Sequence, residues 1–383
     1  MAFSPPITDE IAAEAVAALQ EHGSYERAAK SLGIARSTFG NRLLKAAQRG
    51  LDGSVPKPIP PGQRVKGLST LYDAGGNKVL EWVKTADDAS IADLTQTVKD
   101  AFEGWVPPAW DNGTAPITDA DLMTVYSLAD IHLGLRAVAD ESGADFDLDI
   151  ASKRFRDVTA RLFDRSPNSD TALILQLGDF SHVDDDLALT PSSKNTLQVS
   201  DRLLDIAKVG VQIMVDYVYH ALRKHRRVIV KVLKGNHDLN AWIALYIGLS
   251  EHFRGNDRVT IDGGSADYWF FRFGVTLIGA HHGHRLKPEQ MAGAMAMECR
   301  EDWGETLYRL FLHGHLHHRR VIEVLGVSVE CMRTIAEVDQ HHSGKYGSGK
   351  SLTSITLHRT NGEDGRQQIN LPPIYKRAVR MSA

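Results

Sequence analysis

The sequence predicts an α/β domain preceded by a small helical domain. Three short, continuous apolar runs, at 122–129, 171–177 and 228–233, have the length and composition of strands that are buried on both faces. The segments between them, 148–165 and 197–225, show the periodicity of amphipathic helices. Because strands and helices alternate, we expect an α/β plan.

Four later runs, at 268–280, 307–313, 320–334 and 352–358, have the composition of strands joined by tight turns such as the one at Phe273-Gly274. We expect these strands to pair in antiparallel fashion. The chain of 383 residues is long enough for an α/β domain with appendages.

The first 52 residues are expected to form three short helices. An apolar stripe predicts the first at 8–22, and two more follow at 24–33 and 35–50, with glycines at the turns. The segment A-A-x-x-L-G-I-x-x-S-T at 28–38 resembles the helix-turn-helix units of bacterial transcription regulators. The resemblance places six polar residues on or near the exposed face of the reading helix: Arg36, Ser37, Thr38, Asn41, Arg42 and Lys45.

The distribution of charge also favours contact between this region and DNA. The whole chain has a net charge of -4, which gives no nucleic-acid signal, but nine basic and only two acidic residues lie between 24 and 66. Such a basic block can follow a phosphate backbone. The alternatives are a small interaction or oligomerisation module and an ordinary solvated surface.

The composition of the next segments predicts connecting structure. Residues 53–64 carry four prolines and are typical of a semi-rigid linker. Turn residues at 73–77 between two β-type runs predict a hairpin, a helix is expected near 90–102, and 105–116 form a second linker. We therefore expect three parts: a helix-turn-helix-like domain at 1–52, a Pro-rich linker with a small connecting subdomain at 53–116, and the α/β domain at 117–383.

The chain has the composition of a soluble protein. No apolar run approaches the length that spans a bilayer, and the N-terminus lacks the pattern of a secretory signal. Cys299 and Cys331, the two cysteines, have no metal-ligand spacing and fit a reducing compartment. We expect a cytoplasmic chain that does not contact membranes, and its oligomeric state stays open.

Each of five predicted strands is followed within a few residues by carboxylate, amide or imidazole groups. The segments are Asp130-Ile131-His132, Gly178-Asp179, Gly235-Asn236-His237-Asp238, His281-His282-Gly283 and Gly314-His315-Leu316-His317. One such segment alone is often a surface pair, but five in succession at strand ends are hard to explain by packing. Because sites assemble at strand ends in α/β sheets, a metal centre is the favoured interpretation.

In this order, the five segments resemble the signature of the calcineurin-like metallophosphoesterase superfamily. The resemblance covers about 117–350. It implies a two-sheet αββα sandwich flanked by helices. It also implies that the α/β domain is the catalytic domain of a hydrolase that acts on phosphate esters. It also implies two metal ions, one held by Asp130, His132, Asp179 and His317, and the other by Asp179, Asn236, His282 and His315.

In this scheme Asp179 bridges two divalent ions. Mixed imidazole and carboxylate ligands suit Mn²⁺, which we expect, with Fe and Zn²⁺ as alternatives. Two cations about 3.5–4 Å apart can share a hydroxide and hold a phosphate for in-line attack. By resemblance, His237 lies beside the leaving-group oxygen as the catalytic proton donor. Asp238, grouped with it, is expected to orient the loop.

Two features of the segments leave alternatives open. Many members of the superfamily have an acidic residue three positions after the bridging aspartate, where this chain has His182. Either an aspartate at 184–186 replaces that acid, or His182 shapes the substrate pocket. His281 and His284 crowd around His282, and the placement directly before glycine favours His282 as the ligand.

Residues 344–351 match the pattern G-x-x-x-x-G-K-[ST] of a nucleotide-binding loop. A true loop of this kind needs a strand before it and a helix after it, and the residues that follow have the pattern of a strand. We expect a flexible loop in which Lys345 and Lys350 can touch substrate phosphate, or an ordinary solvated loop.

Three features favour DNA as the substrate. The first is the basic helix-turn-helix-like region, and the second is Leu133-Gly134 after His132, because D-x-H-L-G is common in the DNA-repair exonuclease branch. The third is that the layout is similar to uncharacterised phage and prophage phosphoesterases. We predict a phosphodiesterase or nuclease that acts on DNA. The alternatives are a phosphomonoesterase or small-nucleotide phosphodiesterase, and a DNA-binding regulator that uses the fold as a scaffold.

Overall fold

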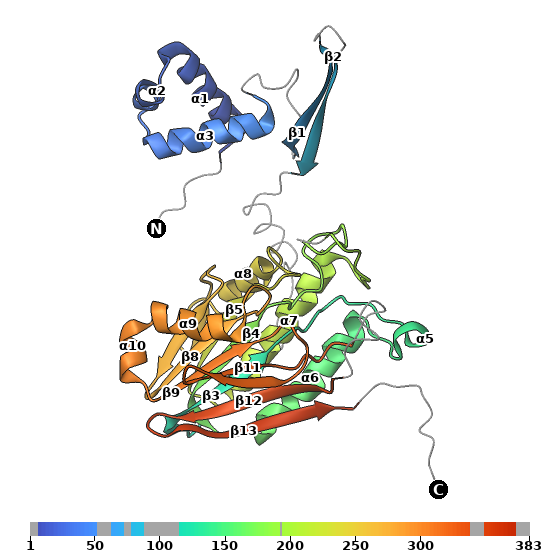
Figure 1. Cartoon of the computed structure of the whole chain (residues 1–383), viewed down its shortest axis with the longest axis vertical. Coiled ribbons are helices and arrows are strands. Elements are labelled where there is room, and N and C mark those ends of the chain that lie inside the picture. Colours follow the sequence, from blue (N-terminus) through green and yellow to red (C-terminus); the bar gives the residue numbers. More distant parts are fainter. Residues whose placement is uncertain are drawn as a thin grey trace. The chain divides into compact units, whose positions relative to one another are not determined.

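The computed structural model describes residues 7–51, 63–72, 78–87, 115–191, 194–337 and 348–372. The chain divides into two compact units, Met1–Thr97 and Val98–Ala383, and each is considered by itself (Figure 1). The predicted helix near 90–102, most of both linkers, and the loop with Lys345 lie outside the described residues. The finer boundaries at 52 and 116 stay a prediction.

The first unit contains the three predicted helices and the predicted hairpin. The helices are α1 (Asp9–His22), α2 (Tyr25–Ser31) and α3 (Arg36–Arg49), and the antiparallel hairpin strands are β1 (Gln63–Tyr72) and β2 (Lys78–Asp87). Gly23 ends α1 in the left-handed conformation, with φ 64°, and the Ser24 hydroxyl accepts the backbone N–H of Arg27 at the start of α2. The small core of this unit includes Ala15, Ala28 and Phe39.

The second unit contains a six-stranded sheet in the order β13-β12-β3-β4-β5-β6. Its strands are β3 (Asp119–Leu128), β4 (Ser169–Leu177), β5 (Arg227–Leu233), β6 (Val259–Asp262), β12 (Lys350–His358) and β13 (Gly362–Leu371). Strands β3 to β6 run parallel, the usual arrangement where strands alternate with helices. Because parallel strands end at the same edge, the loops after β3, β4 and β5 come together.

A second sheet has five strands in the order β10-β11-β9-β8-β7. They are β7 (Trp269–Phe273), β8 (Thr276–His281), β9 (Tyr308–His313), β10 (Arg320–Val324) and β11 (Val327–Cys331). The antiparallel prediction is right for β7 with β8 and for β10 with β11, but wrong for β8 with β9 and β9 with β11, which are parallel. Between β8 and β9 lie two helices that the sequence analysis missed, α9 (Pro288–Glu298) and α10 (Arg300–Glu305), and a crossover of that length permits parallel pairing.

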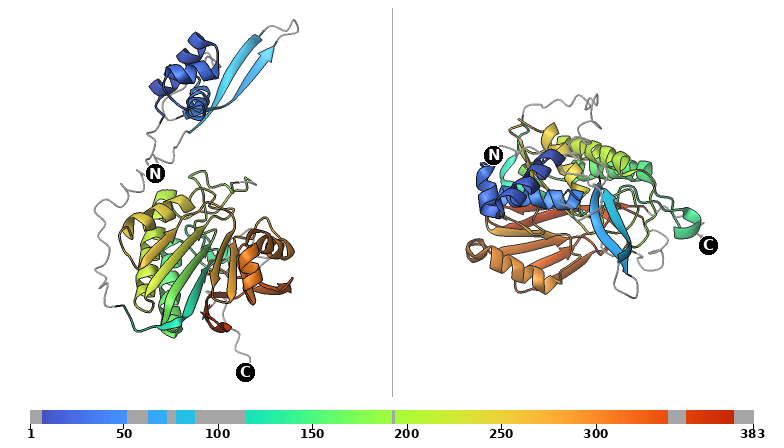
Figure 2. Two further views of the ribbon diagram at one scale, coloured as in Figure 1. Left: turned by 90° about the vertical axis from the view of Figure 1, so that its left-hand side faces the viewer. Right: turned by 90° about the horizontal axis from the view of Figure 1, so that it is seen from above.

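The two sheets pack face to face between helices (Figure 2). Leu173 and Leu175 on one face of β4 join the core between the sheets, whereas Ile174 on the other face joins the core under the helices. Those helices are α6 (Leu148–Arg165), α7 (Leu203–Leu222) and α8 (Trp242–His252), and a short α5 (Ala139–Ser142) precedes them. Met291 and Met295 of α9 pack on the outer face of the five-stranded sheet. The domain is therefore a four-layer αββα sandwich, as predicted.

One smaller expectation is confirmed. Strand β12 begins at Lys350, so a strand and not a helix follows the G-x-x-x-x-G-K-[ST] pattern. Cys299 and Cys331 are both free thiols. Within the described ranges, none of the helices is both long and apolar enough to cross a bilayer.

Candidate metal centre

The predicted metal-binding side chains lie together at the carboxyl ends of β3, β4, β5, β8 and β9. These predicted ligands form two groups whose donor atoms lie within 4.8 Å of one another: Asp130, His132 and His317, and Asp179, His282 and His315. Asn236 joins the second group, because its Oδ1 lies 3.0 Å from His282 Nε2. The seven residues that the sequence predicts as metal ligands therefore lie close together at these strand ends.

Distances within the two groups are those of donors around a cation. His317 Nε2 lies 3.1 Å from His132 Nε2 and 3.3 Å from Asp130 Oδ1. Two donors that each sit about 2.1 Å from one ion are separated by roughly 3–3.5 Å. The Asp179 Oδ2 atom connects the groups, at 3.1 Å from His282 Nε2 and 3.9 Å from His132 Nε2. The donor set therefore fits two cations that share Asp179.

The charges in this cluster also fit a cation site. Burial disfavours a charge on His282, yet the Asp179 carboxylate overcomes it and raises the pKa of His282 to about 9. Burial likewise opposes ionisation of Asp179, but the neighbouring imidazoles hold its pKa well below the ordinary value. Burial and the adjacent His237 and His317 push the pKa of His132 well below its usual range. The Asp179 carboxylate therefore attracts positive charge to the position that a cation would occupy.

The tautomer of His282 is set by a backbone contact. His282 Nδ1 lies 2.8 Å from the Leu177 carbonyl oxygen, to which it donates. Its Nε2 atom faces Asp179 and Asn236. This arrangement is the usual one for a metal-binding histidine, whose second nitrogen is held by a carbonyl or carboxylate.

The backbone is strained at the same positions. Eight non-glycine residues in the described part of the chain have a positive φ, and five of them belong to the two donor groups. They are Asp130 (51°), His132 (48°), Asp179 (52°), His315 (72°) and His317 (58°). Non-glycine residues rarely adopt this backbone conformation, which costs about 1–3 kcal/mol and concentrates at functional sites.

Two glycines make room for the carboxylates, which the sequence analysis did not foresee. A Cβ atom on Gly235 would lie 2.0 Å from Asp179 Oδ1, and one on Gly314 would lie 2.4 Å from Asp130 Oδ2. The signal was present in the motifs, because glycine directly precedes Asn236 and His315. These glycines let two loop backbones approach the carboxylates closely.

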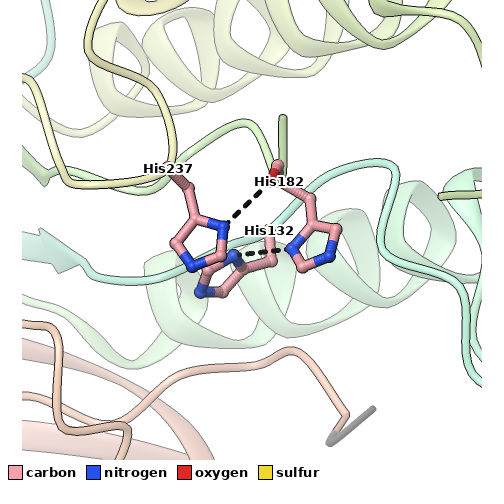
Figure 3. Close-up of side chains that lie close together, drawn as sticks. All are labelled: His132, His182 and His237. Carbon is pink, nitrogen blue, oxygen red and sulfur yellow. Dashed lines mark hydrogen bonds between the residues drawn. The ribbon is translucent and has the colours of Figure 1, made fainter. Parts of the chain in front are cut away.

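His237 lies next to the first donor group but is held by other contacts (Figure 3). Its Nδ1 atom donates to the His182 carbonyl oxygen at 3.0 Å, and its backbone N–H donates to Asp179 Oδ1 at 2.8 Å. Its ring centroid is 4.9 Å from that of His132. Because a carbonyl only accepts, the Nδ1 atom carries a proton, and Nε2 is the ring nitrogen that this carbonyl group does not engage.

None of the three aspartates at 184–186 replaces the acidic residue that the resemblance places at position 182 as the partner of His237. Asp184 Oδ1 accepts the backbone N–H groups of Asn240 and Ala241, at 2.6 and 2.8 Å. Asp185 and Asp186 accept backbone N–H groups from Leu187 and Leu203. The carbonyl group of His182 therefore orients His237 in their place.

Asp238 is fully buried and binds backbone. Its Oδ1 accepts N–H groups of Gly235 at 2.7 Å and Asp179 at 3.1 Å, and its Oδ2 accepts those of Phe180 at 2.8 Å and Ser181 at 3.3 Å. Burial and the Asp179 carboxylate raise its pKa to about 7, against the effect of the N–H donors. These contacts are those of a side chain that orients two loops, and a catalytic role for Asp238 stays a prediction.

The other histidines of the two motifs are arranged around the donor groups. His281 Nδ1 accepts the Gly283 N–H, and His313 Nδ1 donates to the Gly314 carbonyl oxygen. His284 lies closer to the site, with its ring centroid 5.3 Å from His282 and 6.2 Å from His315. Of the crowded run 281–284, His282 is the residue that enters a donor group, and its role as a metal ligand stays a prediction.

The predicted DNA-contacting residues lie along α3, in the other unit. Arg36, Ser37, Thr38 and Asn41 are exposed. Arg42 is half-buried and pairs with Glu14 of α1 at 3.4 Å, and Lys45 is half-buried as well. Arg49, counted in the basic block, is buried and bound to Asp9 at 2.9 Å. The start of α3 is therefore the more accessible part of the predicted surface.

Several solved structures are similar to this chain. An archaeal phosphodiesterase has 16% identity and a TM-score of 0.34 over 65% of this chain and all of its own. A predicted phosphoesterase of Streptococcus pneumoniae has 15% identity and a TM-score of 0.28 over 66% of this chain and all of its own. The E. coli phosphoesterase YfcE has 13% identity and a TM-score of 0.31 over 64% of this chain and 98% of its own.

Likenesses at this level do not assign an activity. No protein-family model matches the chain, and no curated protein matches its sequence. The chemistry of the site therefore has to be argued from its own residues.

Proposed function

We propose that this chain hydrolyses phosphate esters with two divalent metal ions, and that it acts on phosphodiesters of DNA. The observation that carries the proposal is the convergence of seven side chains from five strand ends into two donor groups joined by Asp179. Asp130, His132 and His317 would hold one ion, Asn236, His282 and His315 the other, and Asp179 both. Such ions, with Mn²⁺ expected, lower the pKa of a shared water and neutralise phosphate charge.

The chain's own contribution to proton transfer is His237. Its Nδ1 proton is committed to the His182 carbonyl group, so the ring presents Nε2 to the site. Protonated at both nitrogens, the ring can donate its Nε2 proton to a departing oxygen, a step typically worth about 10²–10⁴-fold in rate. Replacing His237 with Asn is expected to lower kcat by such a factor and leave metal content unchanged.

The choice of DNA rests on the first unit. Arg36, Ser37, Thr38 and Asn41 form an exposed polar row at the start of α3, in a segment where basic residues outnumber acidic ones. Helix N-terminal residues of this type contact base edges and phosphates in helix-turn-helix proteins. A tethered DNA-binding unit would raise the local concentration of phosphodiester near the metal centre.

A substrate panel tests the reaction. The purified chain is analysed for bound metal, loaded with Mn²⁺, and assayed on a bis-aryl phosphate, a mono-aryl phosphate and linear single- and double-stranded DNA. Cleavage of diesters and DNA supports the proposal, and preference for the monoester points to a phosphomonoesterase. A metal-loaded chain that binds DNA without turning over any substrate would indicate a regulator built on this fold.

The DNA surface is tested separately in the full chain. Arg36→Ala and Asn41→Ala are compared with Arg161→Ala, which removes an exposed charge from α6 in the second unit. We expect the α3 variants to bind a DNA duplex more weakly, and Arg36→Ala to reduce the salt dependence by about one unit of slope. Turnover of the bis-aryl phosphate should not change. Unaltered DNA binding in both α3 variants would exclude this surface.

A further inference from the structure

His182 contacts the candidate metal ligand His132 through its ring. The two Nδ1 atoms are 3.2 Å apart, and both side chains are buried, with 2% exposure each (Figure 3). The ring of His182 also lies 5.2 Å from the ring of His237, in a stacked arrangement. His182 is thus packed against both a candidate metal ligand, His132, and the candidate proton donor, His237.

When His132 binds a cation, its contact with His182 constrains where the ring protons lie. His132 Nε2 faces His317 and Asp179, so this nitrogen needs a lone pair to bind a cation. The remaining proton of His132 is then on Nδ1, which has to donate to His182 Nδ1. His182 in turn accepts at Nδ1 and carries its own proton on Nε2.

We infer that His182 is a positioning residue, whose ring accepts a hydrogen bond from His132 and thereby sets the tautomer that binds the first metal ion. This inference rests on the proposed two-metal function. In the second donor group the Leu177 carbonyl oxygen has the same task toward His282, at 2.8 Å. The chain thus uses a neutral imidazole where a carboxylate or carbonyl group usually supports a metal-bound histidine.

A third cation between these histidines fits the contacts less well, although His132, His182 and His237 have donor atoms within 4.8 Å of one another. A cation bound between the two Nδ1 atoms would require His132 to lose both ring protons. His237 Nδ1 is already directed at the His182 carbonyl oxygen. A hydrogen bond needs neither change.

Three substitutions at His182 separate hydrogen bonding from packing. His182→Asn keeps an acceptor near the position of Nδ1, His182→Asp supplies a charged acceptor, and His182→Leu keeps bulk but accepts nothing. In all three the backbone carbonyl group that holds His237 remains. Loss of a group that supports a metal-bound histidine typically costs about 10–100-fold in metal affinity.

The readout is the affinity and stoichiometry of Mn²⁺ binding by calorimetry, with thermal unfolding of the metal-free variants as a check on folding. We expect two equivalents of metal throughout. The affinity of one of them should fall about 10–100-fold in His182→Leu and about threefold or less in His182→Asn, and it should be retained or improved in His182→Asp. A kcat measurement on the bis-aryl phosphate at saturating metal should show the Leu variant largely restored.

Three outcomes would overturn the inference. The first is a Mn²⁺ affinity that is the same in all three variants as in the parent chain. The second is the same loss of Mn²⁺ affinity in all three variants. The third is a third equivalent of bound metal in the parent chain that disappears in His182→Leu. Should His182→Leu fail to fold, the comparison of Asn and Asp with the parent chain still decides, since the hydrogen-bond argument requires both to bind two metals. A parent chain that binds no metal would instead refute the proposed function.

Discussion

Asp238 offers the sharpest test of how the metal centre is built. Its two carboxylate oxygens accept four backbone N–H groups, from Gly235 and from residues 179–181. These residues belong to the two loops that carry Asn236 and Asp179. Replacing Asp238 with Asn keeps the size of the side chain but turns one acceptor into a donor. We expect this change to weaken both folding and metal binding.

The size of the effect follows from the contacts. The amide oxygen of Asn can replace Oδ1 and still accept from Gly235 and Asp179, but the amide nitrogen then faces the N–H groups of Phe180 and Ser181. Each buried donor left without an acceptor costs about 1–3 kcal/mol, so two cost about 2–6 kcal/mol. That is a large part of the roughly 5–15 kcal/mol that stabilises a typical domain.

The assay is urea unfolding of the metal-free chain and of Asp238→Asn, at about pH 8, where the carboxyl group with its pKa of about 7 is ionised. Calorimetry then measures Mn²⁺ affinity, which should fall because Asp179 is no longer held. If the variant unfolds at the same urea concentration and binds metal like the parent, yet loses turnover, the carboxylate acts on the substrate and the positioning argument is wrong.

Three further predictions concern other residues. Burial lowers the pKa of His225 from 6.5 to about 4, so its stabilising effect is complete above about pH 6.5 and is lost as the pH falls toward 4. Between pH 7 and 5 the free energy of unfolding should drop by about 2 kcal/mol more than in His225→Gln, as measured by urea titration. Gly235→Ala places a Cβ 2.0 Å from Asp179 Oδ1 and should abolish high-affinity metal binding, as measured by calorimetry. The control is Gly293→Ala in α9, where a Cβ meets nothing within 4 Å. It should leave metal binding intact and stabilise the chain by up to about 1 kcal/mol. His282→Ala should lose one equivalent of metal by elemental analysis and keep the other, and retention of both would remove His282 from the ligand set.

Much of the site was predictable because its signals are local. Each donor group follows an apolar run, and an apolar run buried on both faces predicts a strand whose end lies near other strand ends. The same reasoning predicts β3, β4 and β5 and the helix at 148–165, whose observed bounds are identical. The glycine that follows His282 favours this residue over His281 and His284 as the ligand.

Other features depended on contacts between distant segments. The parallel pairing of β8 with β9 follows from the crossover through α9 and α10, whose periodicity was not recognised. By sequence, any of the aspartates at 184–186 is a candidate for the acidic partner of His237. In the fold, each of them instead accepts backbone N–H groups of other residues.

The sequence by itself determined the chemical inventory: which carboxylates, amides and imidazoles stand at strand ends, in which order, and beside which glycines. Only the tertiary structure decided which donors face one another, that Asp179 reaches both groups, and that His182 contacts His132 with its ring and His237 with its backbone carbonyl group. The physical reason is that residue type and periodicity are properties of a short segment. A hydrogen bond between residues 50 positions apart, such as that of His182 with His132, exists only once the strands have found their neighbours.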